Sequence, residues 1–108
     1  MAPMAYASHG TVVVDDERVG RDEYLTVIAK PSDTIDVDET IKLFVIRDAS
    51  QDYDYEVTFY SLTPSVASVS GNFIYGLSPG TAKILYKYQN LDLLWIPPFF
   101  GTFYIYVE

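Results

Sequence analysis

The sequence predicts an all-β fold, an antiparallel β-sandwich of about seven to eight strands. The best windows alternate apolar and polar residues with a period of two, and helical periodicity is hard to find. Aromatic residues make up 16% of the 108 residues, and ten residues are tyrosines, which favour strands. Turns rich in Gly, Pro, Asp and Asn separate the apolar runs at regular spacing.

The first half of the chain contains β-prone or alternating runs that predict strands. They are TVVV (11–14), YLTVIAK (24–30), TIDVDET (34–40), IKLFVIR (41–47) and YEVTFYS (55–61). In IKLFVIR, Ile41, Leu43 and Val45 share the face that is expected to point into the core. Phe44 and Ile46 lie on the opposite face, where an open sheet would carry polar residues. We therefore expect this face to be covered by the N-terminal segment, by the loop around Trp95 or by another chain.

The second half contains further short strands separated by turns. They are VASV (66–69), FIY (73–75), AKILYKY (82–88) and TFYIYV (102–107). In the last strand, Phe103, Ile105 and Val107 are expected to point inward. Tyr104 and Tyr106 then point outward. The chain shows no internal repeat, and its length suits a single domain.

Three segments match a known pattern when they are taken together. VTFYSLTPSVASVS (57–70) is similar to a strand followed by SSNPSVATVS, and FIYGLSPGTAKILYKY (73–88) is similar to GVVTGVSPGTATI. LTVIAKPSDTIDVDETIKLFV (25–45) supplies a strand, a break, a turn and a second strand in the matching order. Over residues 24–108 the chain thus resembles the bacterial Ig-like domain, group 2 (BIG2), family.

The chain also departs from the family pattern. Phe59 stands where the family usually has Trp, and Asp38 stands where it usually has Gly. The segment QNLDLLWIPPFFG (89–101) is longer and more apolar than the family's hairpin, and residues 1–23 have no counterpart. The resemblance implies an Ig-like sandwich at 24–108, preceded by an N-terminal arm or extra strand at 1–23. It implies a structural or binding module rather than an enzyme.

Charge and length exclude two classes of partner. Seven basic against fifteen acidic residues give a net charge of -8, and the basic residues form no stripe. We therefore expect no nucleic-acid partner, because the phosphate backbone would be repelled. The longest apolar run, LLWIPPFF, has eight residues, whereas a membrane-spanning helix needs about 20. We therefore expect no membrane insertion.

The residue types also argue against catalysis and cofactors. The chain has no cysteine, and His9 is its only histidine. We therefore expect no catalytic residue, no cofactor and no metal site. The acidic runs at 33–39 and 48–56 offer oxygen ligands for calcium, but neither matches an EF-hand loop. We interpret them as solvated acidic edges that discourage aggregation.

Large apolar side chains outside the expected core are the candidate interface residues. They are Phe44, Ile46, Trp95, Phe99, Phe100, Tyr104 and Tyr106. Pro97 and Pro98 cannot donate hydrogen bonds to a sheet, so the segment 91–101 is expected to form a loop before the last strand. Its aromatic residues either cap one end of the core or dock on a partner, and we favour docking because aromatic side chains are enriched at interfaces.

The expected function is that of a non-enzymatic Ig-like structural or interaction module. We expect a phage virion protein of the head or tail, with a structural or decoration role, because members of the resembled family occur there and the chain starts with Met. The alternative is a repeat from a bacterial cell-surface adhesin, with carbohydrate binding through Trp95 or the tyrosines as an option. The partners are then protein subunits of a larger assembly or surface glycans, on a virion or at the cell surface.

Overall fold

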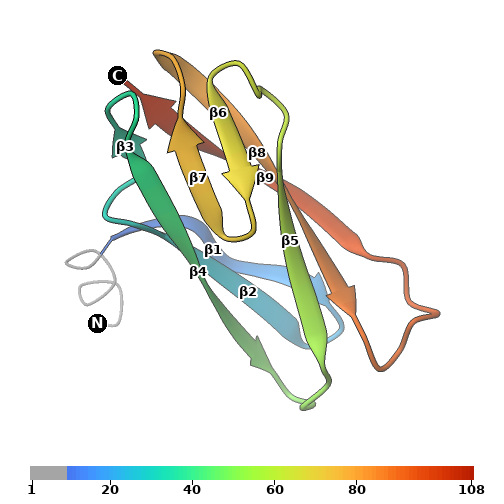
Figure 1. Ribbon diagram of the computed structural model, residues 1–108. Coiled ribbons are helices and arrows are strands. Elements are labelled where there is room, and N and C mark those ends of the chain that lie inside the picture. The colour runs from blue at the N-terminus through green and yellow to red at the C-terminus, as the bar shows by residue number, and fades with distance from the viewer. Residues whose placement is uncertain (1–9) are drawn as a thin grey trace.

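The chain folds into two stacked β-sheets, which Figure 1 shows. The computed structural model describes residues 10–108, and these contain nine strands and no helix. The strands are β1 (Thr11–Gly20), β2 (Glu23–Lys30), β3 (Thr34–Ile35), β4 (Thr40–Ala49), β5 (Tyr55–Ser61), β6 (Ala67–Ser70), β7 (Phe73–Gly76), β8 (Gly80–Asn90) and β9 (Phe99–Val107). One sheet has the order β1-β2-β4-β7-β6, and the other has the order β3-β9-β8-β5. The predicted all-β sandwich is confirmed.

The strand order is that of an immunoglobulin-like sandwich. Strands β2-β4-β7-β6 correspond to the A-B-E-D sheet of that fold, and β5-β8-β9 correspond to the C-F-G sheet. The structure adds β1 at the edge of the first sheet and β3 at the edge of the second, which raises the number of strands above the expected seven or eight. The short pair β3 and β9 is parallel, with Thr34 opposite Tyr106, and the other strand pairs are antiparallel as predicted.

The core lies between the two sheets and follows the predicted alternation. Ile41 and Leu43 from β4 are almost fully buried against Ile84 from β8 and Phe103 and Ile105 from β9. Burial of each such side chain stabilises the fold by about 1.5–3 kcal/mol. Side chains of both sheets contribute, so neither sheet is stable alone.

Strand β1 extends the first sheet beyond the Ig-like part. It pairs with β2, and its Val14 and Val19 belong to the hydrophobic core. The sequence predicts a strand only for 11–14, but β1 continues to Gly20 because bulges interrupt the ladder and let the charged residues 15–18 face solvent. Asp16 has a positive φ of 48° at this irregularity. The part of segment 1–23 that the structure describes is thus integrated in the sandwich.

Strand β5 is an open edge of the second sheet. Hydrogen bonds flank it at both ends: Leu91 N–H donates to the Asp54 carbonyl and Leu62 N–H donates to the Lys83 carbonyl, both at 2.8 Å. Backbone bonding alternates along an antiparallel pair, so every second residue of β5 bonds toward β8. The backbone groups that point away from β8 are those of Tyr55, Val57, Phe59 and Ser61. Figure 1 shows β5 as an outer strand of the molecule.

The β3–β4 turn joins the two sheets at one end of the sandwich. Asp38 N–H donates to the Gly76 carbonyl, and Gly76 N–H donates to the Glu39 carbonyl, both at 2.9 Å. Asp38 has a φ of 70°, which glycine adopts freely and aspartate tolerates better than most residues. The turn therefore selects a glycine-like residue at position 38.

Candidate functional site

The seven expected interface residues do not form one patch. Phe44 and Ile46 lie on the outer face of β4, and Trp95 lies in the β8–β9 loop (91–98). Phe100, Tyr104 and Tyr106 alternate with the buried residues of β9 and therefore lie on the outer face of the opposite sheet. Phe99 points inward. The structure thus offers three separate surfaces.

The start of β9 corrects one expectation. The sequence places Phe99 and Phe100 in the loop, whereas β9 begins at Phe99, directly after the two prolines. Phe99 is half-buried, and its ring centroid lies 6.2 Å from that of Tyr86 in the core. Phe100 points outward opposite Lys87 and is 52% exposed. Phe99 therefore contributes to core packing, and Phe100 belongs to a sheet face.

The outer face of β5, β8 and β9 is rich in large apolar side chains, and we term it the aromatic face. It consists of Tyr60, Leu62, Leu85, Phe100, Tyr104 and Tyr106. The register places Tyr60 beside Leu85, and Leu85 beside Thr102 in the next strand. All six side chains except Leu85, which is half-buried, are exposed. The predicted interface residues do not include the two leucines or Tyr60. The alternation in YEVTFYS nevertheless places Tyr60 on the outer side of the strand, because its neighbour Phe59 points inward.

Two lysines lie within the aromatic face. Lys83 is the cross-strand partner of Tyr104, and Lys87 is the partner of Phe100. Among residues 10–108, the one ion pair joins Arg47 to Glu23, so neither lysine has a carboxylate partner there. The face thus combines large aromatic side chains with two unpaired positive charges.

The outer face of the first sheet is different in character. The ammonium groups of Lys30 and Lys42 lie 4.3 and 4.9 Å from the centroid of the Phe44 ring. Phe44 is half-buried, and Ile46 remains exposed. Cation–π contacts of this kind stabilise by about 0.5–1 kcal/mol each at exposed sites. The lysine side chains therefore cover part of the face that we expected another segment to cover.

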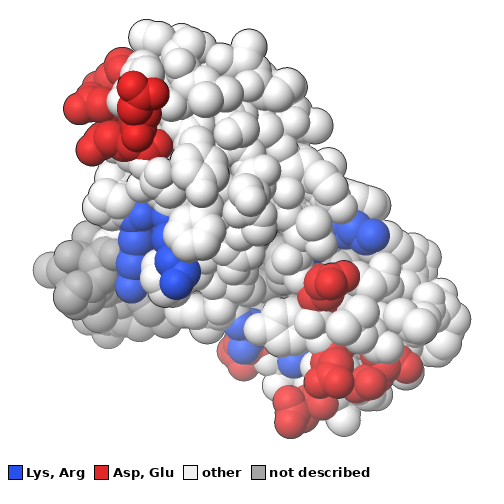
Figure 2. All heavy atoms as spheres, in the orientation of Figure 1, with Lys and Arg blue, Asp and Glu red and all other residues white. Residues whose placement is uncertain are grey.

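Charges are segregated along the molecule. Figure 2 shows Asp and Glu side chains gathered at the two ends of the visible face, with a group of Lys and Arg side chains between them. One acidic end includes the β3–β4 turn with the run 33–39, and the other includes the β4–β5 loop with the run 48–56. Among the residues that the structure describes, no group of three His, Cys, Asp or Glu side chains could hold a metal ion.

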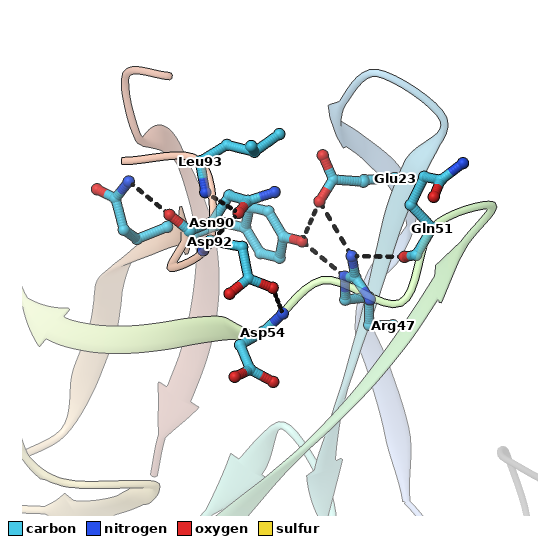
Figure 3. A network of polar contacts seen from close by, with 9 residues as sticks. Glu23, Arg47, Gln51, Asp54, Asn90, Asp92 and Leu93 are labelled. Carbon is cyan, nitrogen blue, oxygen red and sulfur yellow. Dashed lines mark hydrogen bonds and ion pairs between the residues drawn. The ribbon is translucent and has the colours of Figure 1, made fainter. Parts of the chain in front are cut away.

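A buried polar network fastens the two sheets together at one end, as Figure 3 shows. Tyr88 from β8 donates its hydroxyl to Glu23 Oε1 of β2 at 2.6 Å and accepts from Arg47 Nε of β4 at 2.7 Å. Arg47 also contacts Glu23 Oε1 at 3.2 Å and donates to the Gln51 carbonyl. The Tyr55 ring stacks on Tyr88 with a centroid distance of 5.7 Å. The network therefore holds the β4–β5 loop (50–54) against the core.

The network shifts the pKa values of its members. Burial raises the pKa of Tyr88 to about 12, and its hydrogen bond to Glu23 adds to the rise. Burial lowers the pKa of Arg47, but its hydrogen bonds to Tyr88 and Glu23 outweigh this and leave the pKa raised. Tyr88 thus stays protonated and Arg47 stays charged throughout the physiological range.

The β8–β9 loop is fixed by Asn90. The Asn90 Oδ1 atom accepts hydrogen bonds from the backbone N–H groups of Asp92 and Leu93 at 2.9 and 2.8 Å. Asp92 Oδ2 accepts from Asp54 N–H at 2.9 Å, which ties this loop to the β4–β5 loop. The Asn90 Nδ2 atom is buried and has no hydrogen-bond partner among the described residues. The loop is therefore held in place by polar contacts at its base.

A pocket of about 390 Å³ lies at the same end of the sandwich. The β1–β2 turn, the β4–β5 loop and the β8–β9 loop form its walls. Its lining includes Arg21, Glu23, Gln51, Tyr53, Leu93 and Trp95. Trp95 is 79% exposed and so does not cap the core, which was one of its two expected roles. The pocket therefore brings together three chain segments that are far apart in the sequence.

Three further observations concern the histidine, the membrane and known proteins. His9, the only histidine, lies outside the described residues. Residues 10–108 include no helix long and apolar enough to cross a membrane. No family model, no curated protein and no solved structure matches this chain. The evidence on function therefore comes from the residues and geometry of the protein surface.

Proposed function

We propose that this chain is a non-enzymatic Ig-like interaction module that docks on a protein subunit of a larger assembly through its aromatic face. The observation that carries the proposal is that five large apolar side chains, Tyr60, Leu62, Phe100, Tyr104 and Tyr106, are exposed on the outer face of one sheet. Tyrosine and phenylalanine are enriched at the cores of protein interfaces, and exposed groups of large apolar side chains often mark interaction sites.

The two lysines define what the partner surface must supply. Lys83 and Lys87 would lose water on docking, and an unpaired buried ammonium group is costly. A matching partner therefore offers apolar side chains and carboxylates at the positions of the lysines. Glu56 lies on the same outer side of β5 as Tyr60, at the edge of this face, and would repel an acidic partner there.

The setting that we propose is a phage virion, where the module acts as a head or tail structural or decoration protein. The resemblance to the BIG2 family supports this. PSVASV leads into β6, SPGTAKI opens β8, and Asp38 adopts a glycine-like φ at the position where that family usually has glycine. The alternative setting is a repeat of a bacterial cell-surface adhesin.

The docking role is tested by reconstitution with the parent assembly. Tyr104→Ser removes a 46% exposed ring on the β9 side of the aromatic face, and Tyr75→Ser removes a similarly exposed ring from the opposite sheet. We expect the first variant to bind the assembly at least about tenfold more weakly and the second to bind like the wild type. Equal binding by both variants would show that the aromatic face is not the docking surface.

The setting is tested separately by mass spectrometry of purified fractions. A virion protein is expected in purified particles at fixed stoichiometry, identified there by peptides of this sequence. A surface repeat is expected in cell-envelope fractions instead. Either result decides between the two settings without depending on the docking face.

A further inference from the structure

The free side of β5 carries a row of backbone hydrogen-bonding groups that its own chain leaves unused. The groups that point away from β8 are those of Tyr55, Val57, Phe59 and Ser61. Within residues 10–108, β8 is the one strand that pairs with β5, and no backbone hydrogen bond reaches these groups from elsewhere. A row of free N–H and C=O groups at a sheet edge is a template for one more strand. The partner of this edge is therefore an extended segment of polypeptide.

The side chains of β5 set the pattern that an added strand must match. Val57 and Phe59 point inward and belong to the core or pack against it. Glu56, Thr58 and Tyr60 alternate with them and point outward. A strand that continues the sheet must likewise place apolar side chains inward, and it can carry polar side chains outward. A second copy of β5 has this alternation.

An antiparallel second copy of β5 fits the edge in a register that uses the whole strand. A two-fold axis through Thr58 places this residue opposite its own counterpart and pairs all seven residues of β5. Val57 then forms a hydrogen-bonded pair with Phe59 of the second copy. Tyr55 forms such a pair with Ser61 of the second copy, so every unused backbone group of the edge finds a partner. Thr58 lies at a non-hydrogen-bonded position, where cross-strand threonine pairs stabilise a sheet.

The charges near the edge are compatible with this register. Glu56, the only charged residue of β5, lies opposite Tyr60 of the second copy and not opposite its own counterpart. Asp54, just before the strand, lies opposite Leu62 of the second copy, and Leu62 N–H donates to the Lys83 carbonyl on its other side. Asp54 of one copy and Lys83 of the other are then about two strand spacings, roughly 10 Å, apart. Their attraction offsets part of the repulsion between two chains with a net charge of -8 each.

We propose that two copies of this chain associate edge to edge through β5 into a two-fold symmetric dimer. The two four-stranded sheets, each with the order β3-β9-β8-β5, then join at β5 into one sheet of eight strands. Because the two-fold axis is perpendicular to the sheet, the aromatic faces of both copies lie on the same side. The proposal stands independently of the docking role of that face, and the dimer presents the face twice.

Sedimentation of the full chain over a range of concentrations measures the dimer. A single strand pair buries less surface than a permanent dimer requires, so we expect a Kd of about 10–100 µM. Thr58→Lys places two ammonium groups opposite each other on the axis and should weaken the dimer at least about tenfold. Thr40→Lys is the matched control, because Thr40 is an exposed threonine on β4 of the opposite sheet, and it should dimerise like the wild type. Circular dichroism confirms that both variants are folded.

Disulfide cross-linking tests the register, because the chain has no cysteine of its own. Non-hydrogen-bonded partners have Cα atoms about 4.5 Å apart, which lies within the range that a disulfide spans. Thr58→Cys should therefore give a covalent dimer on a non-reducing gel after mild oxidation, and Thr40→Cys should react much more slowly. Glu56→Cys and Tyr60→Cys should cross-link when they are mixed, and each should cross-link poorly alone.

Three outcomes would overturn the proposal. The first is a wild-type chain that stays monomeric at about 1 mM, tenfold above the highest expected Kd. The second is a dimer that Thr58→Lys leaves intact, and the third is equally fast cross-linking of Thr58→Cys and Thr40→Cys. A monomer that instead binds an extended peptide of another protein along β5 would also refute the assignment to a second copy. Tyr104→Ser changes β9 and should leave the dimer unchanged, so failure of the docking test and failure of the dimer test are distinguishable.

Discussion

The Tyr88 hydroxyl is expected to contribute strongly to stability, because its hydrogen bonds link the two sheets. The substitution Tyr88→Phe removes this hydroxyl and keeps the ring. The substitution deletes the bond to Glu23 at 2.6 Å and the bond from Arg47 at 2.7 Å. A hydrogen bond to a charged group contributes about 1.5–3 kcal/mol, and the two charges still contact each other at 3.2 Å afterwards. We therefore expect the free energy of unfolding to fall by about 2–4 kcal/mol.

Urea unfolding followed by circular dichroism measures this loss. With a denaturant dependence of about 2 kcal/mol per molar, in the middle of the range for small domains, the midpoint should fall by about 1–2 M. The control is Tyr60→Phe, because Tyr60 is an exposed tyrosine on the aromatic face, and its change should stay within about 0.5 kcal/mol. A loss below about 1 kcal/mol for Tyr88→Phe would refute the reasoning, because the hydroxyl would then be replaceable by water.

Three further substitutions or conditions test other parts of the structure. Gly101→Ala places a methyl group against the Tyr86 ring in the core and should lower the melting temperature, with about 1–3 kcal/mol of destabilisation; an unchanged melting temperature would contradict the packing. Asp38→Val forces a β-branched residue to a φ of 70° and should cost about 1–3 kcal/mol in urea unfolding, whereas Asp38→Gly should not destabilise by as much. Burial raises the pKa of Tyr86 and of Tyr88 from 10 to about 12. The unfolded chain therefore loses these protons first, so stability that is complete below pH 10 should fall as the pH rises toward 12. Tyr88→Phe should show a weaker fall in the same alkaline titration, and an equal fall would exclude Tyr88 as a source.

The period of two predicts which side of a strand faces inward, but not which sheet the strand joins. In β9, the inward Phe103, Ile105 and Val107 and the outward Tyr104 and Tyr106 lie as predicted. The exposed interface candidates nevertheless lie apart, because β4 and β9 belong to opposite sheets and Trp95 lies in the β8–β9 loop. Strand order depends on pairings between distant segments, which alternation within one segment does not encode.

The polar network was missed, although the sequence holds a signal for it. Glu23 continues the inward series of Leu25 and Val27 in β2, and Arg47 continues that of β4. Tyr88 and Asn90 likewise continue the inward series of β8. Polar residues at inward positions of three strand ends predict a buried polar cluster at one end of a sandwich. The pocket above it was not predictable in the same way, because three unconnected loops form it.

The difference between the edge strands has a consequence for how the protein behaves at high concentration. β1 is protected by bulges and charged side chains, and β3 and β6 are short. β5 presents seven residues without proline or a bulge, and Glu56 is its only charged side chain. Intermolecular sheet growth, whether as ordered chains of copies or as aggregates during expression, is therefore expected to begin at β5. An engineer who needs a soluble monomer would place a lysine there before altering any other part of the surface.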